Sequence, residues 1–367
     1  MMKLNPAATI TEEFAERIKS ENRSAKMMKL APLIVLACLV VVFLIVCGAS
    51  FLSPKNIMNI LNQMALPLVV ALGLTFVIML GSIDLSIDGS VGMAGSLFAC
   101  FVLNSEFAYD LGFLSVVIAV GVSMLCGLLI GLCHVYLKIP SFMASFAFMY
   151  ICKGIGMVSY QGHPPTIKDP VITALPTTTF LGIPFITWVA IVMFLLCFFI
   201  QEYTAFGRHI YAVGTNENIP RSVGVSVEKV KIGVFTLAGC LFGVAGVIGA
   251  IRLGQGQIAI GDDKMFPAQA AVVVGGTSLA GGKGGVVNTI VGVLIMTVLI
   301  MTKPLSSTVI ISTVIINTIV GVLIMTVLDN GLVMLNVNPN IRTGVQGVII
   351  LVAVILTAAR GAKVISK

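Results

Sequence analysis

The sequence has little charge for its length. Only 10% of its 367 residues are Asp, Glu, Lys or Arg, whereas 58% are hydrophobic and the mean hydropathy is +1.08. So few charged side chains cannot cover the surface of a water-soluble protein of this size. Short alternating segments of the kind that build a transmembrane barrel are also absent. We therefore predict an integral membrane protein whose apolar segments, each of about 20 residues, cross the membrane as helices.

Motifs for metal binding, nucleotide binding and covalent catalysis are lacking as well. The eight cysteines form no CxxC pair, and the three histidines lie far apart in the sequence. A phosphate-binding loop would need glycine at position 277 and Ser or Thr at 284, where the chain has Thr277 and Gly284. We expect no metal, no cofactor bound by this chain and no nucleic-acid partner, so energy must come from a partner protein or an ion gradient.

Eleven apolar segments are candidate membrane spans. They cover residues 31–50, 60–80, 89–104, 113–136, 142–160, 182–200, 231–252, 267–280, 286–302, 308–328 and 344–359, of which 267–280 is the weakest. We expect residues 1–30 to form a cytoplasmic arm, 31–360 a transmembrane domain in contact with lipid, and 361–367 a cytoplasmic tail. Basic residues place the arm, Lys138, the loop at 201–230 and the tail on the cytoplasmic side.

A repeated stretch accounts for the odd number of spans, which would leave the basic tail outside. NTIVGVLIMTVL occurs at residues 288–299 and again at 317–328. Removal of one unit leaves ten spans with both termini inside. We therefore predict an all-α, polytopic bundle of about ten transmembrane helices with a duplicated extra apolar segment at 300–328. One copy should take the membrane position, and the other should be displaced.

Two carboxylates interrupt the apolar run GSIDLSIDGSVGM. Asp84 and Asp88 would each cost about 2.5–3.5 kcal/mol at the centre of a lipid-facing helix, so they must face water, protein or a helix end. The surrounding Gly and Ser residues break the helix, and we expect an Asp or Ser just before VGMAGSLFAC to cap a new helix, so that the two aspartates mark a turn between two spans. Direct contact with a transported solute is the alternative. Lys153, inside another apolar segment, either snorkels to the membrane interface or lines the path.

Two further segments combine small and polar residues. The loop at 201–230 is either an ordinary solvated loop or a docking element with a short helix, for which Asn216 or Asn218 would be the N-cap, Pro220 would lie in the first turn and Gly224 would end the helix. The segment AAVVVGGTSLAGGKGGVV permits close approach of helices. Its central small residues are Gly275, Gly276, Thr277 and Ser278.

These stretches resemble the ribose-type permeases of bacterial ATP-binding cassette (ABC) importers. Residues 73–95 are similar to the family's Gly-Gly-Ile-Asp-Leu-Ser signature, except that Ser82 replaces the second glycine and Asp88 is an extra residue. Residues 270–279 are similar to its Ala-Val-Val-Ile-Gly-Gly-Thr-Ser-Leu segment, and Lys153 stands where the family tends to have Arg or Lys. The family's Gly-Arg-x-x-Tyr-Ala-x-Gly-x-Asn segment, which contains the coupling helix, is matched by Gly207, Arg208, Tyr211, Ala212, Gly214 and Asn216.

The resemblance implies the permease subunit of a monosaccharide importer in the bacterial inner membrane, with its N-terminus in the cytoplasm. It implies three protein partners: a cytoplasmic ATPase that carries ATP and Mg²⁺, an extracytoplasmic solute-binding protein, and a second permease copy. The chain itself would not be an enzyme. The residues implied in coupling are Gly207, Arg208, Gly214, Asn216, Glu217, Arg221 and Gly224, and those implied in the path or helix break are Asp84, Ser86, Asp88 and Lys153.

Two other functions fit the same sequence features. A permease for a nucleoside or a branched-chain amino acid would belong to the same superfamily. An ion-coupled secondary transporter would use an intramembrane carboxylate such as Asp84 and would place its site on broken helices near the membrane midplane.

Overall fold

The computed structural model of the chain describes residues 51–301, together with residues 34, 36–37, 40–41 and 44–45. The predicted arm at 1–30, the repeat copy at 317–328 and the tail at 361–367 lie outside the described residues.

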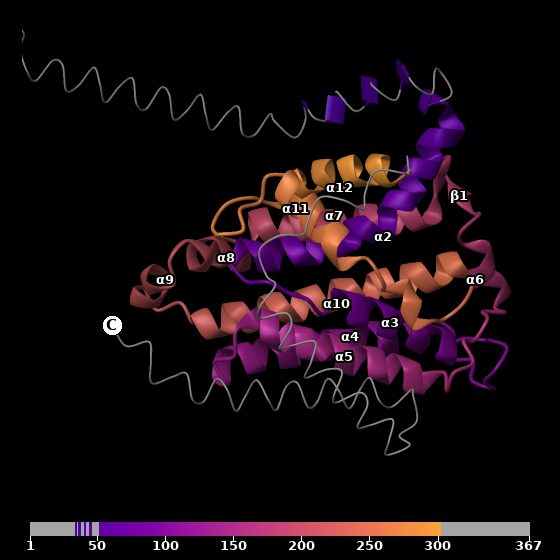
Figure 1. Cartoon of the computed structure of the whole chain (residues 1–367), viewed down its shortest axis with the longest axis horizontal. Helices are drawn as coiled ribbons and strands as arrows, with labels where there is room; N and C mark the ends of the chain where they lie inside the picture. The colour runs from indigo at the N-terminus through magenta and orange to yellow at the C-terminus, as the bar shows by residue number, and fades with distance from the viewer. Residues whose placement is uncertain (1–33, 35, 38–39, 42–43, 46–50, 302–367) are drawn as a thin grey trace, which may run out of the picture.

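The described part of the chain is a bundle of apolar helices (Figure 1). Five of its helices are long and apolar enough to cross a membrane: α2 (Pro54–Met79), α4 (Leu114–Tyr136), α5 (Ser141–Ser159), α7 (Phe185–Tyr203) and α10 (Val227–Leu253). The shorter elements are α3 (Ile87–Phe101), α6 (Pro170–Ala174), α8 (Ala205–Thr215), α9 (Asn218–Ser222), η2 (Ile258–Ile260), α11 (Met265–Val274), α12 (Val286–Met301) and an antiparallel pair of strands, β1 (Thr179–Phe180) and β2 (Ile183–Pro184). The predicted polytopic helical bundle is confirmed, while the count of about ten spans includes segments beyond the described residues.

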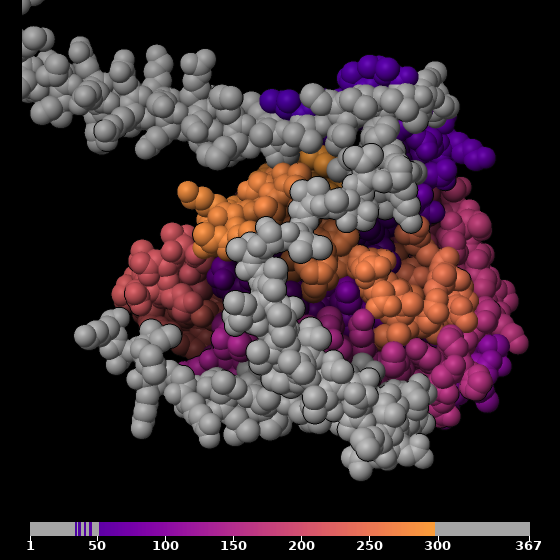
Figure 2. Space-filling view, in the orientation of Figure 1, coloured from indigo at the N-terminus to yellow at the C-terminus, as the bar shows by residue number. Residues whose placement is uncertain are grey.

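The bundle has two ends, which Figures 1 and 2 show at the left and right of the view. At the left end, α8 and α9 lie beside the end of α2, because the backbone of Gly214 is packed against the carbonyl of Met79. At the right end, backbone bridges join Asn104 to Ile167 and Thr166 to Gln255. We call these the α9 end and the α6 end.

Two of the predicted spans are broken crossings rather than continuous helices. After α2 stops at the α9 end, a turn at residues 80–81 and the non-helical residues 82–86 lead to the start of α3, which continues to the α6 end. The predicted span at 267–280 is also not one helix. Its ten-residue α11, about 15 Å long, is too short to cross alone. It completes a crossing that starts at Gly254, passes through η2 and reaches the α9 end where the N–H of Gly282 donates to Met79.

The first repeat copy, residues 288–299, lies within α12. This helix packs against α2 and α11. The close fit depends on small residues, because a side chain at Gly275 or Gly292 would collide with the backbone of the other helix. The first copy therefore occupies a position inside the bundle.

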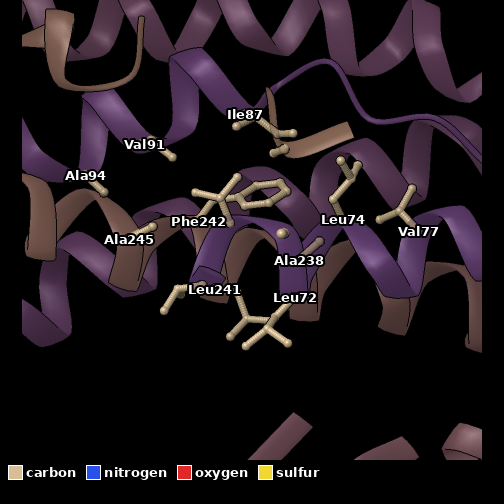
Figure 3. Packing of buried hydrophobic residues seen from close by; sticks show 14 of the residues in the cluster. Leu72, Leu74, Val77, Ile87, Val91, Ala94, Ala238, Leu241, Phe242 and Ala245 are labelled. Atoms are coloured by element: carbon tan, nitrogen blue, oxygen red, sulfur yellow. The ribbon is translucent and has the colours of Figure 1, made fainter. Parts of the chain in front are cut away.

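The hydrophobic core is built around α10, which packs against α2, α3 and α4. Figure 3 shows Phe242 at its centre, surrounded by side chains of three helices. Phe242 is fully buried, and Gly73 on α2 leaves room for its ring. The side chains labelled around it are Leu72, Leu74, Val77, Ile87, Val91, Ala94, Ala238, Leu241 and Ala245.

Helices α4 and α10 approach closely because glycines face each other. Gly127 and Gly131 on α4, four residues apart, lie against the backbone of α10, and Gly239 and Gly243 lie against α4. The hydroxyl of Ser123 donates a 2.8 Å hydrogen bond to the carbonyl of Gly239. In a membrane, where the hydrophobic effect does not drive helices together, such small-residue contacts and interhelical hydrogen bonds hold the pair.

This interface gives a stability prediction with an internal control. The methyl group of Gly127→Ala would collide with the carbonyl oxygen of Phe235 and lie 3.0 Å from the Cα of Gly239, whereas that of Gly121→Ala, on the same helix, meets no atom within 4 Å. Overpacking costs about 1–3 kcal/mol. In detergent, Gly127→Ala should lower the thermal unfolding temperature and Gly121→Ala should not. Equal behaviour of the two variants would contradict the close packing of α4 and α10.

Candidate translocation site and coupling helix

The two broken crossings meet halfway through the bundle. The start of α3 lies against α5 at Met149, near the middle of that helix, because Gly89 leaves no side chain between them. The start of α11 lies beside the same place, since Gly261 is in backbone contact with Asp88. Two helix N-termini, each carrying a partial positive charge, therefore meet inside the bundle.

Asp88 joins the two crossings directly. Although it lies in the first turn of α3, one of its carboxylate oxygens accepts hydrogen bonds from the backbone N–H groups of Lys264, at 3.2 Å, and Met265, at 2.8 Å. These are the first amides of α11. Asp88 thus caps a helix that is distant in the sequence, an arrangement that only the close approach of Gly261 permits.

The local capping predicted just before VGMAGSLFAC is wrong in its details, because α3 already begins at Ile87. Ser86 is the N-cap residue of α3 but makes no capping hydrogen bond with its side chain. Asp84 is 1% exposed, and its carboxylate accepts a 2.8 Å hydrogen bond from the N–H of Ser86, before the helix starts. Asp84 therefore closes a turn in the non-helical segment before α3 and does not cap the helix.

Two serines on α5 hold the non-helical segment before α3 in place. The hydroxyl of Ser141 accepts a hydrogen bond from the N–H of Ile83 at 3.1 Å, and that of Ser145 accepts one from Leu85 at 2.9 Å. Unpaired backbone amides are costly at membrane depth, so non-helical chain is tolerated there only when protein or water satisfies it. Sequence reasoning did not single out these serines.

Lys153 forms an ion pair instead of snorkelling to the interface. Its Nζ lies 2.8 Å from Oδ1 of Asp262, in the segment between η2 and α11. The side chains of Lys153 and Asp262 are 23% and 46% exposed, and the Lys153 charge also interacts with Asp88. We call Asp88, Lys153, Asp262 and Lys264 the central cluster. It fastens α5 and α3 to the second broken crossing.

A polar cavity of about 350 Å³ lies next to the central cluster. Its polar lining comes from Arg252 at the end of α10, Gln257 and Lys264, and its apolar lining includes Leu66 and Ile260. Arg252 lies in the last turn of α10, three residues before the Gln255 bridge at the α6 end, so the cavity extends from the central cluster toward that end. Sequence analysis overlooked Arg252, Gln257, Asp262 and Lys264, although the run GDDK directly before an apolar segment was a signal for them.

At the α9 end, the segment predicted as the loop at 201–230 is mostly helical, and this corrects the loop interpretation. It contains α8, whose N-cap Thr204 accepts a hydrogen bond from Gly207, and the short helix α9. The N-cap of α9 is Glu217 rather than Asn216 or Asn218. The side chain of Asn216 accepts from the N–H of Asn218 at 2.9 Å, so it performs the capping one residue earlier. Gly224, with φ of 83°, follows the helix.

Two ion pairs fix α9 to the start of α10. Arg221 contacts Glu228, and Lys231 contacts Glu217, each with an N–O distance of 2.6 Å. Two apolar side chains in this region face outward, since Ile219 is 61% and Val223 is 74% exposed. An exposed apolar pair between charged residues is typical of a protein contact surface.

Gly207 and Gly214 contribute packing. A side chain at Gly207 would collide with the carbonyl of Gln201, and one at Gly214 with that of Met79. The side chain of Arg208 is exposed and has no hydrogen bond or ion pair among the described residues. Of the residues predicted for coupling, Glu217 and Arg221 lie at α9 itself, whereas the two glycines hold α8 against the bundle.

A junction links α8 to both broken crossings. Gly214 touches the end of α2 and the turn between α11 and α12, where the N–H of Gly282 donates to Met79 at 2.9 Å. Tyr211 on α8 donates a 2.8 Å hydrogen bond to the carbonyl of Gly284 in that turn. Burial raises the pKa of the Tyr211 phenol, which therefore stays protonated and able to donate. A displacement of α8 would act on both crossings.

The predicted small-residue segment forms this turn. Gly276 and Gly284 have φ of 105° and 124°, values that favour glycine. Thr277 is buried, and its hydroxyl accepts a 3.4 Å hydrogen bond from the N–H of Gly285. The N–H of Ser278 donates to the carbonyl of Lys283 at 3.0 Å.

Several apolar helices, two broken crossings and a charged centre between them define a multi-pass membrane transport protein. Residues 56–354 match the family described as branched-chain amino acid transport system / permease component. The chain belongs to this permease family, and the predicted resemblance to ribose-type ABC importer permeases is confirmed.

Curated relatives are sugar permeases. The ribose import permease protein of Bacillus subtilis is 32% identical over 96% of this chain and 99% of the relative. That of Haemophilus influenzae is 36% identical over 67% of this chain and 76% of the relative. The xylose transport system permease protein of Haemophilus influenzae is 27% identical over 76% of this chain and 89% of the relative. No solved structure matches the chain.

Proposed function

We propose that the chain forms the translocation path of an ABC importer for a monosaccharide in the bacterial inner membrane. The observation that carries this proposal is the meeting of two broken crossings at the central cluster, in a chain whose relatives are ribose, xylose and arabinose permeases. A neutral sugar presents hydroxyl groups that both donate and accept hydrogen bonds. The cavity beside the cluster offers matching groups from Arg252, Gln257 and Lys264.

The proposed complex contains three further components. A cytoplasmic ATPase binds ATP and Mg²⁺, a solute-binding protein delivers the sugar from outside, and a second permease copy completes a homodimer. We place the α9 end in the cytoplasm because basic residues gather there, including Lys138, Arg208, Arg221 and Lys229. The chain itself then needs no catalytic residue.

The contacts suggest how ATPase closure would reach the sugar path. The ATPase would hold α9 in a groove through Ile219 and Val223, a helix-in-groove contact. Because α9 is tied to α10 by two ion pairs, force on α9 acts on a helix of 27 residues, about 40 Å long, that ends at Arg252 in the polar cavity. The junction at Gly214 carries the same displacement to both broken crossings. The path would thereby switch between outward-open and inward-open states.

Competition for uptake tests the substrate class. In cells that carry the complete importer, uptake of radiolabelled ribose should be reduced by excess unlabelled xylose or arabinose but not by leucine or adenosine. Inhibition by leucine alone would support a branched-chain amino acid permease, and inhibition by adenosine alone a nucleoside permease. Calorimetry of the solute-binding protein with the same compounds provides an independent measurement.

Asp84→Asn distinguishes an importer from an ion-coupled transporter. The amide keeps the oxygen that accepts from the N–H of Ser86 but removes the charge, so uptake should largely persist and should not depend on a proton or sodium gradient. Uptake is measured with and without an ionophore that dissipates the gradient. Two results together would support the secondary transporter: the ionophore stops wild-type uptake although ATP is present, and Asp84→Asn has no uptake.

A further inference from the structure

A second polar cavity lies at the α9 end, far from the central cluster. Its volume is about 540 Å³, and it is lined by residues of three segments: the end of α4 with the turn to α5, the helix α9, and the first turns of α10. Its lining residues are His134, Val135, Lys138, Ile139, Pro140, Arg221, Val227, Glu228 and Lys231. We call it the basic cleft.

The basic cleft adjoins the close contact between α4 and α10. Gly131 and Ile232 belong to that contact, because a Cβ on the glycine would lie 2.9 Å from the Cα of Ile232. Beyond this point α4 carries the larger His134 and Val135, and α10 carries Lys231 and Glu228. The ring of His134 is held in place by a 2.8 Å hydrogen bond between Nδ1 and the carbonyl of Ile139.

The lining carries more positive than negative charge. Lys138, Arg221 and Lys231 face one lining carboxylate, Glu228, which is paired with Arg221. The side chain of Lys231 is only 17% exposed and pairs with Glu217, which is not one of the residues that line the cleft. Lys138 forms no hydrogen bond or ion pair among the described residues and is exposed. Lys138 is thus a cation without an ion-pair partner among the described residues. The other two cations, Arg221 and Lys231, are held in place by their ion pairs.

Exposed apolar side chains flank the cleft residues in the sequence on the side of α4 and α5. Tyr136 is 68%, Leu137 47% and Phe142 44% exposed, next to Lys138 in the sequence. Aromatic side chains are typical of the membrane interface, and basic pockets between transmembrane helices at the cytoplasmic side bind anionic head groups. A water-soluble anion would make no use of these apolar side chains.

We propose that the basic cleft binds the head group of an anionic phospholipid, whose acyl chains lie against Tyr136, Leu137 and Phe142. The phosphate would contact Lys138 and the cationic ends of Arg221 and Lys231. Such a lipid would bridge the turn between α4 and α5 to the helix α9 and would hold α9 in position. This binding is independent of the sugar that the path carries.

Lipid titration of the purified full-length chain in detergent tests the proposal. The probes are dioctanoyl phosphatidylglycerol, dioctanoyl phosphatidylcholine and glycerol 3-phosphate, with binding measured by native mass spectrometry and by thermal stabilisation. We expect the phosphatidylglycerol to bind and stabilise, and the zwitterionic lipid and the soluble phosphate to bind much more weakly. Lys138→Gln should weaken phosphatidylglycerol binding about fivefold, the effect of one basic side chain near an anionic lipid, and Lys138→Glu should weaken it further.

The matched control is Lys168→Gln, which removes an exposed lysine at the α6 end. It should leave phosphatidylglycerol binding unchanged. Equal losses in Lys138→Gln and Lys168→Gln would mean general charge attraction and would overturn the site. Binding of glycerol 3-phosphate as strong as that of the lipid would assign the cleft to a soluble anion and would also overturn the proposal, as would equal binding of the two lipids. Because Lys138 has no described partner, its variants should fold normally, which the unfolding temperature without lipid verifies.

Discussion

Replacement of Ile219 and Val223 by aspartate should abolish ATP-driven uptake while the protein still inserts into the membrane. Both side chains are largely exposed and lie at α9, so their loss removes no internal contact of the core. If they are the apolar anchors of a helix-in-groove contact, their replacement should cost about 2 kcal/mol or more in docking, roughly 30-fold in affinity. Co-purification with the ATPase and sugar uptake should both be lost.

The control for this variant adds one negative charge nearby without removing an apolar contact. Ser226 is the N-cap residue of α10, a position that favours aspartate, so Ser226→Asp should retain both ATPase association and uptake. Undiminished co-purification and uptake in the Ile219 and Val223 double variant would remove α9 from the coupling interface. The charge pair Arg208→Glu with Glu217→Arg should also uncouple transport, although it additionally breaks the ion pair with Lys231.

Loss of either partner of the ion pair between Lys153 and Asp262 should reduce uptake about tenfold or more. The pair ties α5 to the second broken crossing, and loss of one side chain leaves the other without its ion-pair partner. A factor of ten corresponds to about 1.4 kcal/mol. Breaking a fully buried ion pair costs ~3–5 kcal/mol. We expect a smaller loss here because both side chains are partly exposed. Lys153→Met and Asp262→Asn each test the prediction by initial uptake rates.

A charge exchange and a neighbouring residue make this test specific. The double variant Lys153→Asp with Asp262→Lys should recover part of the uptake that each single variant loses, because the attraction is restored in reverse. Asp263→Asn removes the carboxylate directly beside Asp262. Asp263 is exposed and has a φ of 60°, a conformation that asparagine adopts readily. This variant should therefore transport normally. Equal defects in Asp262→Asn and Asp263→Asn would argue against the pair.

The long helices were predictable from the sequence because apolar length is a local signal. The predicted segments at 113–136 and 142–160 lie within one residue of α4 and α5 at each end. The prediction at 231–252 is shorter than α10 because the first turn of that helix carries Glu228 and Lys229, which belong to its exposed cytoplasmic end in our interpretation. The part of a helix that projects beyond the lipid is polar, so an apolar run in the sequence does not predict it.

The central cluster was only partly predictable, because its contacts connect distant parts of the chain. Asp84, Asp88 and Lys153 stood out as charges in apolar segments. Nothing local indicates that Asp88 caps α11, since this contact depends on the close approach of Gly261. Asp262 lies in the polar run GDDK directly before an apolar segment, but its partner Lys153 is 109 residues away in the sequence and is identified only by the ion pair.

The most direct test of the central claim is sugar uptake into proteoliposomes that contain this chain and the ATPase, with the sugar-loaded binding protein added on the side opposite to α9. We predict that uptake requires ATP on the α9 side, continues in the presence of a proton or sodium ionophore, and stops in the Ile219 and Val223 double variant. Uptake without ATP that an imposed ion gradient drives, and that the double variant leaves intact, would contradict it.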